Sequence, residues 1–459
     1  MKTTIGIEVH AELKTKTKMF CGSLNDPHAA KANMHICPVC LAHPGTLPVI
    51  NREAVLHVIK VGKALGGSIA TFTEFDRKNY FYPDIPKGYQ ISQYKYPIVS
   101  GGTLADVSIT RVHLEEDTAR SIHEGDTSLI DYNRAGVPLM ELVTEPVIHD
   151  PETAVRFAKE LQLLLRVLEV SDANMEKGEM RVEVNVSVSP DNTLGTKVEV
   201  KNINSFKAVE ASIIYEVKRQ TNCIEKGESV VQETRGWDEQ KGKTVSQRIK
   251  ESAEDYRYFP DPDLPKLEIS RLKVDLPELP GKKRLKYSNL GIARKQIEVI
   301  ISDTKLRNFF DMLVMEDLTN TQVILAGNYL TSDIQALLAE DDTLTLENAH
   351  RDTFIALITL VDGGTINSRV AKDLLREVVF EGKNPEKIAA ERGLLQKSSE
   401  DELTKIVEEI LIEHPAVVEE FKSGKEEALQ FLVGQGMKAT RGSANPTMLV
   451  ELLRKQILK

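Results

Sequence analysis

The sequence predicts an α+β fold in which an antiparallel sheet domain precedes all-helical segments. At least four segments within residues 1–290 alternate aliphatic and polar residues with the period of two that is typical of strands. After about residue 290 the apolar residues recur with helical spacing, and the loops between them are short. We therefore expect a strand-rich domain over 1–290, a helical domain over 291–398 and a small helical tail domain over 399–459.

Composition limits the class of protein. Hydrophobic residues make up 41% and charged residues 28% of the 459 residues, so a folded chain with a substantial core is expected. No run of about 18 apolar residues predicts a membrane span, and Met1–Thr4 lead into a strand without a signal peptide, which favours the cytoplasm. The four cysteines fit a reducing compartment. The net charge of −10 argues against broad nucleic-acid binding but leaves a local RNA contact open.

The first predicted strand covers residues 5–12. Its odd-numbered residues are apolar, and its even-numbered side chains are Glu8, His10 and Glu12. Two carboxylates around an imidazole suit a hard cation such as Mg²⁺. The alternative is a solvated, acidic edge strand.

A cysteine pair follows in an irregular segment. The Cys37-Pro38-Val39-Cys40 spacing lets two thiolates reach one tetrahedral Zn²⁺, and Cys21 is a candidate third ligand. Candidates for a fourth ligand are His28, His35 and His43. The alternative is a set of ordinary buried thiols, since free cysteines are often buried.

Residues 51–65 have the pattern of an amphipathic helix with Asn51 as its cap. The next segment, residues 76–90, combines aromatic and basic residues with Pro83 and Pro86, so we expect an extended, non-helical loop. Its composition suits a nucleotide or an RNA terminus, through stacking and phosphate pairing. A rigid structural loop with aromatics in the core is the alternative.

Acidic residues recur on later strands. On residues 111–117 the side chains of Arg111, His113, Glu115 and Asp117 share one face, with Glu116 on the other. This pattern suggests metal binding or acid–base chemistry. Glu141 interrupts an apolar strand, so it must be paired, bound to a metal or exposed.

A helix over 151–169, capped by Asp150, leads to two further strands, residues 180–188 and 197–202. Their polar faces carry Arg181, Glu183, Asn185, Glu199 and Lys201. A face that mixes acids and bases can hold a metal–nucleotide complex, because carboxylates bind Mg²⁺ while arginine and lysine bind phosphates. An antiparallel sheet with one polar face is the simplest assembly of these strands.

A further helix is expected from Asn202 to about Gln220. Pro and Gly residues at 277–281 place a domain boundary near residue 290. In the tail, Ser399-x-x-Glu402 and Ser423-x-x-Glu426 have the form of capping boxes, which mark helix starts.

Several long motifs resemble those of one family, the B subunit of the aspartyl/glutamyl-tRNA amidotransferases, in order along the whole chain. They are Ile5-Gly6-Ile7-Glu8-Val9-His10, Phe75-Asp76-Arg77-Lys78-Asn79-Tyr80-Phe81-Tyr82-Pro83-Asp84, Gly88-Tyr89-Gln90-Ile91-Ser92-Gln93, His113-Leu114-Glu115-Glu116-Asp117, Lys201-Asn202-Ile203-Asn204-Ser205-Phe206, Gln232-Glu233-Thr234-Arg235, Asp255-Tyr256-Arg257-Tyr258-Phe259-Pro260 and Phe431-Leu432-Val433-Gly434-Gln435.

The resemblance implies a cradle domain related to glutamine synthetase, a helical domain, and a tail domain that grips the outer corner of tRNA. It implies a heterotrimer with an amidase (glutaminase), the A subunit, which frees ammonia from glutamine, and with a small C subunit. With ATP and Mg²⁺, the B subunit would phosphorylate the side-chain carboxylate of Glu on tRNA(Gln) or Asp on tRNA(Asn). Ammonia arriving through an internal channel would then displace phosphate.

The resemblance also assigns roles to residues. The Mg²⁺ ligands would be Glu8, His10, Glu115, Glu116, Glu141 and Glu199. The catalytic residues would be Lys78, Glu116 and His10, with Lys78 near the channel exit, either relaying a proton or holding acyl-phosphate oxygens. The polar strand faces add Arg181, Glu183, Asn185 and Lys201 as ATP-binding residues.

The sequence departs from the family pattern twice. Ser23 stands where many relatives have a second cysteine, which leaves Cys21, Cys37 and Cys40 for Zn²⁺. The strand at 181–185 replaces the more usual Arg-Cys-Asp-Ala-Asn but keeps its Arg, acid and Asn order, so we expect the site to be preserved.

Two other functions remain open from the sequence. One is a stand-alone, ATP-dependent ligase that joins ammonia to a small acid, although such a substrate needs no helical or tail domain. The other is a tRNA-binding scaffold without catalysis. No arrangement of nucleophile, histidine and acid suggests that this chain hydrolyses glutamine, so an amidase partner is expected.

Overall fold

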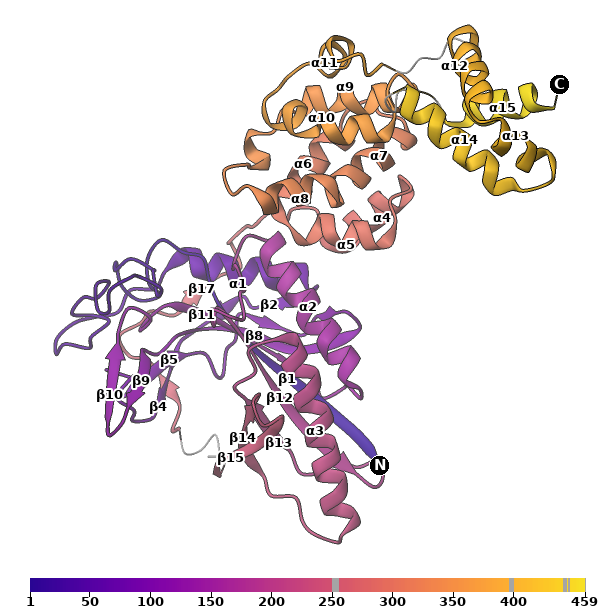
Figure 1. Cartoon of the computed structure of the whole chain (residues 1–459). Helices are drawn as coiled ribbons and strands as arrows, with labels where there is room; N and C mark the ends of the chain where they lie inside the picture. The colour runs from indigo at the N-terminus through magenta and orange to yellow at the C-terminus, as the bar shows by residue number, and fades with distance from the viewer. Residues whose placement is uncertain (250–255, 396–399, 441–443, 445, 459) are drawn as a thin grey trace. The chain divides into compact units, whose positions relative to one another are not determined.

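The computed structural model describes residues 1–249, 256–395, 400–440, 444 and 446–458. The chain divides into two compact units, Met1–Pro280 and Gly281–Lys459. The first unit contains a large sheet with helices, and the described part of the second contains helices only (Figure 1). The division lies at the start of helix α4 (Pro280–Asn289), whereas the sequence placed it near residue 290.

One ten-stranded sheet dominates the first unit. Its strands are β1 (Lys2–Glu12), β2 (Ser68–Ile69), β6 (Val99–Ser100), β7 (Thr103–Leu104), β8 (Val107–Glu116), β11 (Pro138–Thr144), β12 (Met180–Ser189), β13 (Val198–Lys201), β14 (Glu233–Asp238) and β15 (Lys243–Ile249). The strand order is β15-β14-β13-β12-β1-β11-β8-β6-β2, with β7 paired to β8. Strand β1 thus lies in the interior of the sheet, between β11 and β12, and is not an edge strand.

The sheet is mixed, so the predicted purely antiparallel sheet is wrong at one pair. Strands β13 and β14 run parallel, and the other neighbouring pairs are antiparallel. The helix α3 (Phe206–Glu225) lies between β13 and β14 in the chain. A crossover of this length returns the chain to the same end of the sheet, which permits a parallel pair.

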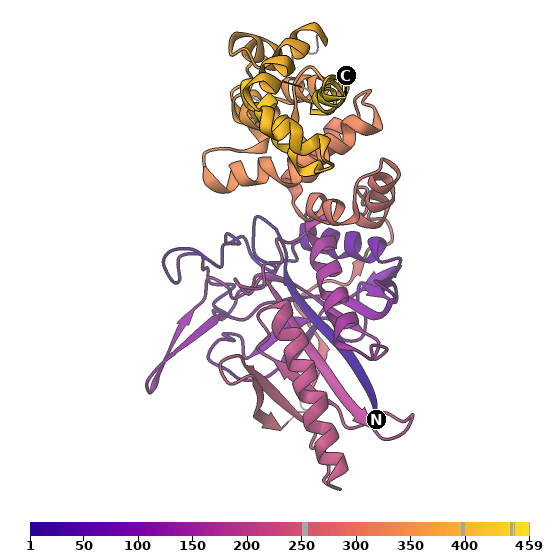
Figure 2. The same ribbon diagram turned by 45° about the vertical axis from the view of Figure 1, so that its right-hand side comes forward.

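Three helices supply the apolar partner of the sheet: α1 (Arg52–Ala64), α2 (Pro151–Val167) and α3. Figure 2 shows α2 and α3 side by side along the sheet. The apolar residues of β1 and of these helices belong to one buried cluster. The other face of β1 therefore remains for its polar residues.

The helix predictions are confirmed within a few residues. The side chains of Asn51, Asp150 and Ser205 cap the three helices by accepting backbone N–H groups. Helix α3 runs to Glu225, five residues beyond the expected end at Gln220.

Smaller β-elements border the sheet. They are a three-stranded sheet of β4 (Asp76–Asn79), β5 (Tyr89–Ser92) and β16 (Phe259–Pro260), the pair β3 (Phe72–Thr73) with β17 (Leu267–Glu268), and the hairpin of β9 (Arg120–Glu124) and β10 (Thr127–Asp131). The segment 76–90 was predicted to be an extended loop. Its two ends instead belong to strands β4 and β5, which pair with each other, and β4 also pairs with β16.

The second unit is built from short helices. After α4 they are α5 (Arg294–Ser302), α6 (Thr304–Val314), α7 (Asn320–Thr331), α8 (Asp333–Glu340), the 3₁₀ helix η1 (Leu346–Asn348), α9 (Arg351–Asp362), α10 (Ser368–Phe380), α11 (Pro385–Glu391), α12 (Glu400–Glu413), α13 (Pro415–Lys422), α14 (Glu426–Ala439) and α15 (Pro446–Ile457). Buried apolar residues between 403 and 457 form a cluster of their own. No helix among the described residues is long and apolar enough to cross a membrane.

The two capping boxes fare differently. Ser399 lies outside the described residues, so the first stays a prediction. The second is wrong: Ser423 ends α13, where its hydroxyl donates to the carbonyl of Glu420, and the residue before α14 is Lys425.

Candidate functional site

The strand register gathers acids and imidazoles on the polar face of the sheet. His10 on β1 lies opposite Glu141 on β11 and Arg181 on β12. Glu141 in turn lies opposite His113 on β8, so one row crosses four strands. Glu8 occupies the next position on this face of β1, opposite Glu183. The alternation that the sequence predicted therefore places these side chains together.

The His10 imidazole is the centre of this cluster. Its Nε2 lies 3.4 Å from Glu141 Oε2, 3.6 Å from Glu115 Oε1 and 3.7 Å from Glu8 Oε1. Two groups of ligand atoms lie within 4.8 Å of one another: Glu8, His10 and Glu183, and His10, Glu115 and Glu141. Each group combines carboxylate oxygens with the same histidine and could hold a hard cation.

Proximity and burial shift the acidities of this cluster. Burial raises the pKa of Glu8 to about 7, and the charge of Glu141 acts in the same direction. Burial alone would lower the pKa of His10, but hydrogen bonding to Glu141 and the surrounding carboxylates raise it to about 9. Burial opposes ionisation of Glu141, yet His113 and His10 hold its pKa well below the ordinary value. Without a cation, a proton on His10 balances these carboxylates.

The predicted ATP-binding residues lie beside the cluster on β12 and β13. Lys201 Nζ is 2.7 Å from Glu183 Oε2, and Arg181 Nη2 is 2.7 Å from Asp117 Oδ2. Glu199, a predicted Mg²⁺ ligand, accepts a hydrogen bond from Thr234 Oγ1 at 2.8 Å and is outside both ligand groups.

Several buried polar atoms on this face lack a partner among the described residues. They are Arg181 Nε, Asn185 Oδ1 and His113 Nδ1. Because buried polar groups normally find hydrogen-bond partners, these atoms fit a face that binds a polar ligand. Carboxylates for Mg²⁺ together with arginine and lysine for phosphates match a Mg²⁺–nucleotide complex in their chemistry.

Lys78 on β4 reaches the same region from outside the large sheet. Its Nζ lies 4.9 Å from the ring centroid of Tyr256 and 5.7 Å from that of Tyr80. Burial disfavours its charge, but Tyr258, Glu115 and other nearby groups raise its pKa above the ordinary value. Among the described residues it has neither an ion pair nor a hydrogen-bond acceptor, so this cation is available to an anionic ligand.

Glu116 lies apart from the cluster around His10. Its carboxylate receives hydrogen bonds from Lys87 Nζ at 2.6 Å and from the N–H of Ile91 at 3.0 Å. Alternation turns it away from Glu115, its neighbour in sequence. The structure thus brings Glu8, His10, Glu115 and Glu141 together but does not bring Glu116 to them.

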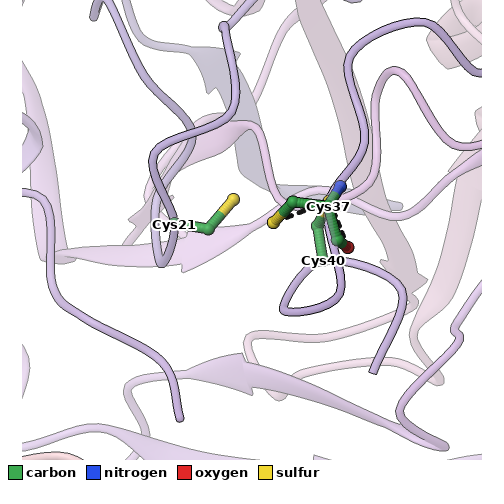
Figure 3. Close-up of side chains that lie close together, drawn as sticks. All are labelled: Cys21, Cys37 and Cys40. Atoms are coloured by element: carbon green, nitrogen blue, oxygen red, sulfur yellow. Dashed lines mark hydrogen bonds between the residues drawn. The ribbon is translucent and has the colours of Figure 1, made fainter. Parts of the chain in front are cut away.

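The three cysteines meet in a separate group (Figure 3). The Sγ atoms of Cys21, Cys37 and Cys40 lie within 4.8 Å of one another, and the sulfurs of Cys37 and Cys40 are 3.8 Å apart. No histidine among the described residues belongs to this group. The buried Lys18 ammonium lies 3.9 Å from Cys40 Sγ.

Some residues of the site were not assigned a role from the sequence. His113 Nε2 lies 3.3 Å from Glu141, and Arg111 Nη2 lies 3.5 Å from the same carboxylate. Alternation had placed both on the correct face, which was the available signal. Ser92 donates a 3.0 Å hydrogen bond to Glu115 from β5, and no local pattern could have found this contact.

Comparison with known families matches most of the chain. Residues 3–275 match the family model described as the GatB/GatE catalytic domain. Residues 308–457 match the model described as the GatB domain. The two matches lie within the first and second units, respectively.

Curated relatives are similar over their full length. One is the B subunit of aspartyl/glutamyl-tRNA(Asn/Gln) amidotransferase from Thermus thermophilus, 46% identical over 464 residues, with 98% of both chains covered. The protein of the same name from Thermoanaerobacter sp. is 43% identical, covering 100% of this chain and 99% of the relative. That from Persephonella marina is 43% identical, with 99% of both covered. The chain belongs to the family of aspartyl/glutamyl-tRNA(Asn/Gln) amidotransferase B subunits.

Proposed function

We propose that this chain is the part of a tRNA-dependent amidotransferase that activates and amidates the side-chain carboxylate of Glu on tRNA(Gln), Asp on tRNA(Asn), or both. The reaction class is an ATP-dependent ligase that forms a C–N bond. The chain's membership of the family supports this proposal. The single structural observation that carries it is the cluster of Glu8, His10, Glu115 and Glu141 beside the lysines and arginines of the same face.

The chemistry explains why such a face is needed. A carboxylate is a poor electrophile, and its conversion into an acyl phosphate supplies a leaving group that ammonia can displace. Phosphoryl transfer is catalysed mainly by positioning and by stabilisation of charge. Bound Mg²⁺ would neutralise negative charge on the phosphate oxygens. Glu8, His10, Glu115 and Glu141 would hold it, with Glu183 next to them, and Arg181 and Lys201 would bind the nucleotide.

Lys78 would hold the oxygens of the activated carboxylate. Its ammonium has no acceptor among the described residues, and the raised pKa keeps it charged. A lysine that stays protonated is a poor proton relay. Of the two roles that the sequence left open, we therefore assign the electrostatic one.

The ammonia would come from elsewhere in a complex. The family name, B subunit, designates one part of a larger enzyme. We propose that an amidase, the A subunit, supplies ammonia through an internal channel and that a small C subunit completes a heterotrimer. We place this complex in the cytoplasm. The helices α12–α15 would bind tRNA.

We further propose that Cys21, Cys37 and Cys40 hold Zn²⁺. Three thiolates around Zn²⁺ leave one net negative charge, which the buried Lys18 ammonium would balance. The fourth position would be open to a small ligand, since Ser23 replaces the fourth cysteine.

The function is tested by phosphate release that depends on misacylated tRNA. The assay uses the chain co-expressed with its amidase and small partners, ATP, Mg²⁺ and Glu-tRNA(Gln) or Asp-tRNA(Asn). The adjacent variants Glu115→Gln and Glu116→Gln form a matched pair, because both side chains are buried but only Glu115 contacts His10. We expect Glu115→Gln to lower kcat by about 100-fold or more and Glu116→Gln to have a much smaller effect.

Other outcomes would contradict parts of the proposal. An equal loss of kcat in both variants would contradict the proposal that the His10 cluster binds the metal. No tRNA-dependent phosphate release by the unmodified complex would favour the scaffold. Release with free glutamate or aspartate in place of tRNA would favour a small-molecule ligase.

A further inference from the structure

Five tyrosine rings form a continuous chain of contacts next to Lys78. In spatial order they are Tyr82, Tyr80, Tyr256, Tyr258 and Tyr94. The first three contacts and the last differ in geometry. Tyr82–Tyr80, Tyr80–Tyr256 and Tyr256–Tyr258 meet at interplanar angles of 63°, 73° and 67°. Tyr258 and Tyr94 instead stack, with centroids 4.4 Å apart and an interplanar angle of 11°.

The stacked pair ends in an exposed ring. Tyr258 covers one face of Tyr94, yet 54% of Tyr94 is exposed. A flat aromatic group laid on the open face would continue the stack. Stacking of a nucleobase on a tyrosine is the usual way in which proteins hold unpaired nucleotides, and it is indifferent to base identity.

The backbone beside each of the two stacked rings is anchored to β4. Tyr258 precedes β16, whose Phe259 pairs with Arg77 on β4. The backbone N–H of Tyr94 donates to Asp76 Oδ2 at 2.9 Å, so the same strand anchors Tyr94. A rigid platform loses little conformational entropy when it binds its ligand.

The inner end of the stack leads towards Lys78. On its inner side Tyr258 contacts Tyr256, whose ring centroid lies 4.9 Å from Lys78 Nζ. A base on the outer face of Tyr94 would therefore be separated by three rings, Tyr94, Tyr258 and Tyr256, from Lys78, the group proposed to hold the activated carboxylate. In an aminoacyl-tRNA, the carboxylate to be activated is joined through an ester to the ribose of the terminal nucleotide, so base and carboxylate must bind close together.

We infer that the Tyr94–Tyr258 stack is the platform for the terminal base of the aminoacyl-tRNA. The inference rests on the proposed function, since it names where one part of its substrate binds. It explains why the ring of Tyr94 is half exposed although its backbone N–H is hydrogen-bonded to Asp76 on β4.

The experiment measures tRNA binding by the complete complex rather than turnover. Two ligands are compared by fluorescence anisotropy: intact tRNA(Gln) and the same tRNA without its terminal nucleotide. We expect the unmodified complex to bind intact tRNA about tenfold more tightly, which is the usual size of one stacking contact. In Tyr94→Ala this difference should largely disappear. Tyr94→Phe should restore it, because the ring remains.

Controls separate stacking from general damage. Leu194 is also exposed, and it lies between β12 and β13, so Leu194→Ala should leave the tenfold difference intact. KM for ATP should not change in Tyr94→Ala. An unchanged preference for intact tRNA in Tyr94→Ala would overturn the inference. A raised KM for ATP with normal tRNA binding would also overturn it, because the stack would then bind the adenine of ATP. An unmodified complex that discriminates the two tRNAs but forms no amide would contradict the proposed function and leave the platform standing.

Discussion

At the scale of single residues, the protonation of His10 makes both the stability of the fold and metal binding depend on pH. In the metal-free protein its pKa of about 9 lies above the ordinary 6.5, because carboxylates surround the imidazole. Its proton therefore stabilises the folded state fully below pH 6.5, and this contribution is lost as pH rises through about 9. A bound cation must displace the same proton, so protonation and metal binding compete.

We predict that Mg²⁺ binds more tightly as pH rises from about 6 to about 9. Deprotonation of Glu8, near pH 7, and then of His10, near pH 9, removes the competing protons. Titration calorimetry in two buffers of different ionisation enthalpy would count the protons released. In His10→Gln the rise above about pH 8 should vanish. An affinity that is independent of pH in the unmodified protein would contradict metal binding through His10.

At the scale of elements, the packing of α1 depends on a residue without a side chain. A Cβ at Gly62 would lie 2.4 Å from Val99 Cγ2 and 2.7 Å from Ile69 Cδ1. Helix α1 can thus approach β6 and β2 closely only with glycine at this position. The close approach matters because β6 pairs with β8, which carries Glu115.

Gly62→Ala should destabilise the protein. Overpacking costs about 1–3 kcal/mol, and the better helix propensity of alanine returns up to about 1 kcal/mol. Gly434 in α14 is the matched control, because a Cβ there meets no atom within 4 Å. Gly434→Ala should leave stability unchanged or raise it slightly. Denaturant unfolding of the two variants measures the difference, and equal effects would contradict the close packing of α1.

The cysteine group offers a second test at this scale. We predict that the purified protein contains one zinc ion per chain and that Cys37→Ser lowers this content sharply. Elemental analysis measures the zinc directly. Cys223→Ser is the control, because Cys223 lies on α3 and outside the group. Zinc that persists in Cys37→Ser would show that the metal lies elsewhere.

At the scale of the whole molecule, the C-terminal helices have a core of their own. Leu432 is fully buried in the cluster between residues 403 and 457. The chain has a single tryptophan, Trp237, and it lies in the first unit. Its fluorescence therefore reports on that unit, whereas circular dichroism also follows the helices of the second unit.

We predict that Leu432→Ala separates the two signals. Removal of a buried leucine costs about 2–5 kcal/mol, and the loss should fall on the C-terminal helices. Thermal unfolding followed by circular dichroism should begin at a lower temperature, with the tryptophan transition and the Mg²⁺ affinity unchanged. Leu161→Ala, a buried change in α2, should instead shift the tryptophan transition. A tryptophan transition that moves equally in both variants would contradict separate cores.

The sequence by itself determined which side chains share a face of each strand. Alternation is a property of the extended backbone, so the separation of Glu115 from Glu116 and the shared face of Glu8 and His10 could be predicted locally. Capping by Asn51 and Asp150 is equally local. The Ser423 box failed because the same short pattern also occurs at the end of a helix, where Ser423 lies.

Only the tertiary structure decided what those faces meet. The register between β1, β11 and β8 brings Glu141 and Glu115 to His10, although more than 100 residues separate them in the chain. The parallel pairing of β13 and β14, and the approach of Tyr256 to Lys78, likewise join distant segments. Such contacts depend on how whole strands and helices pack, and no short stretch of sequence encodes them.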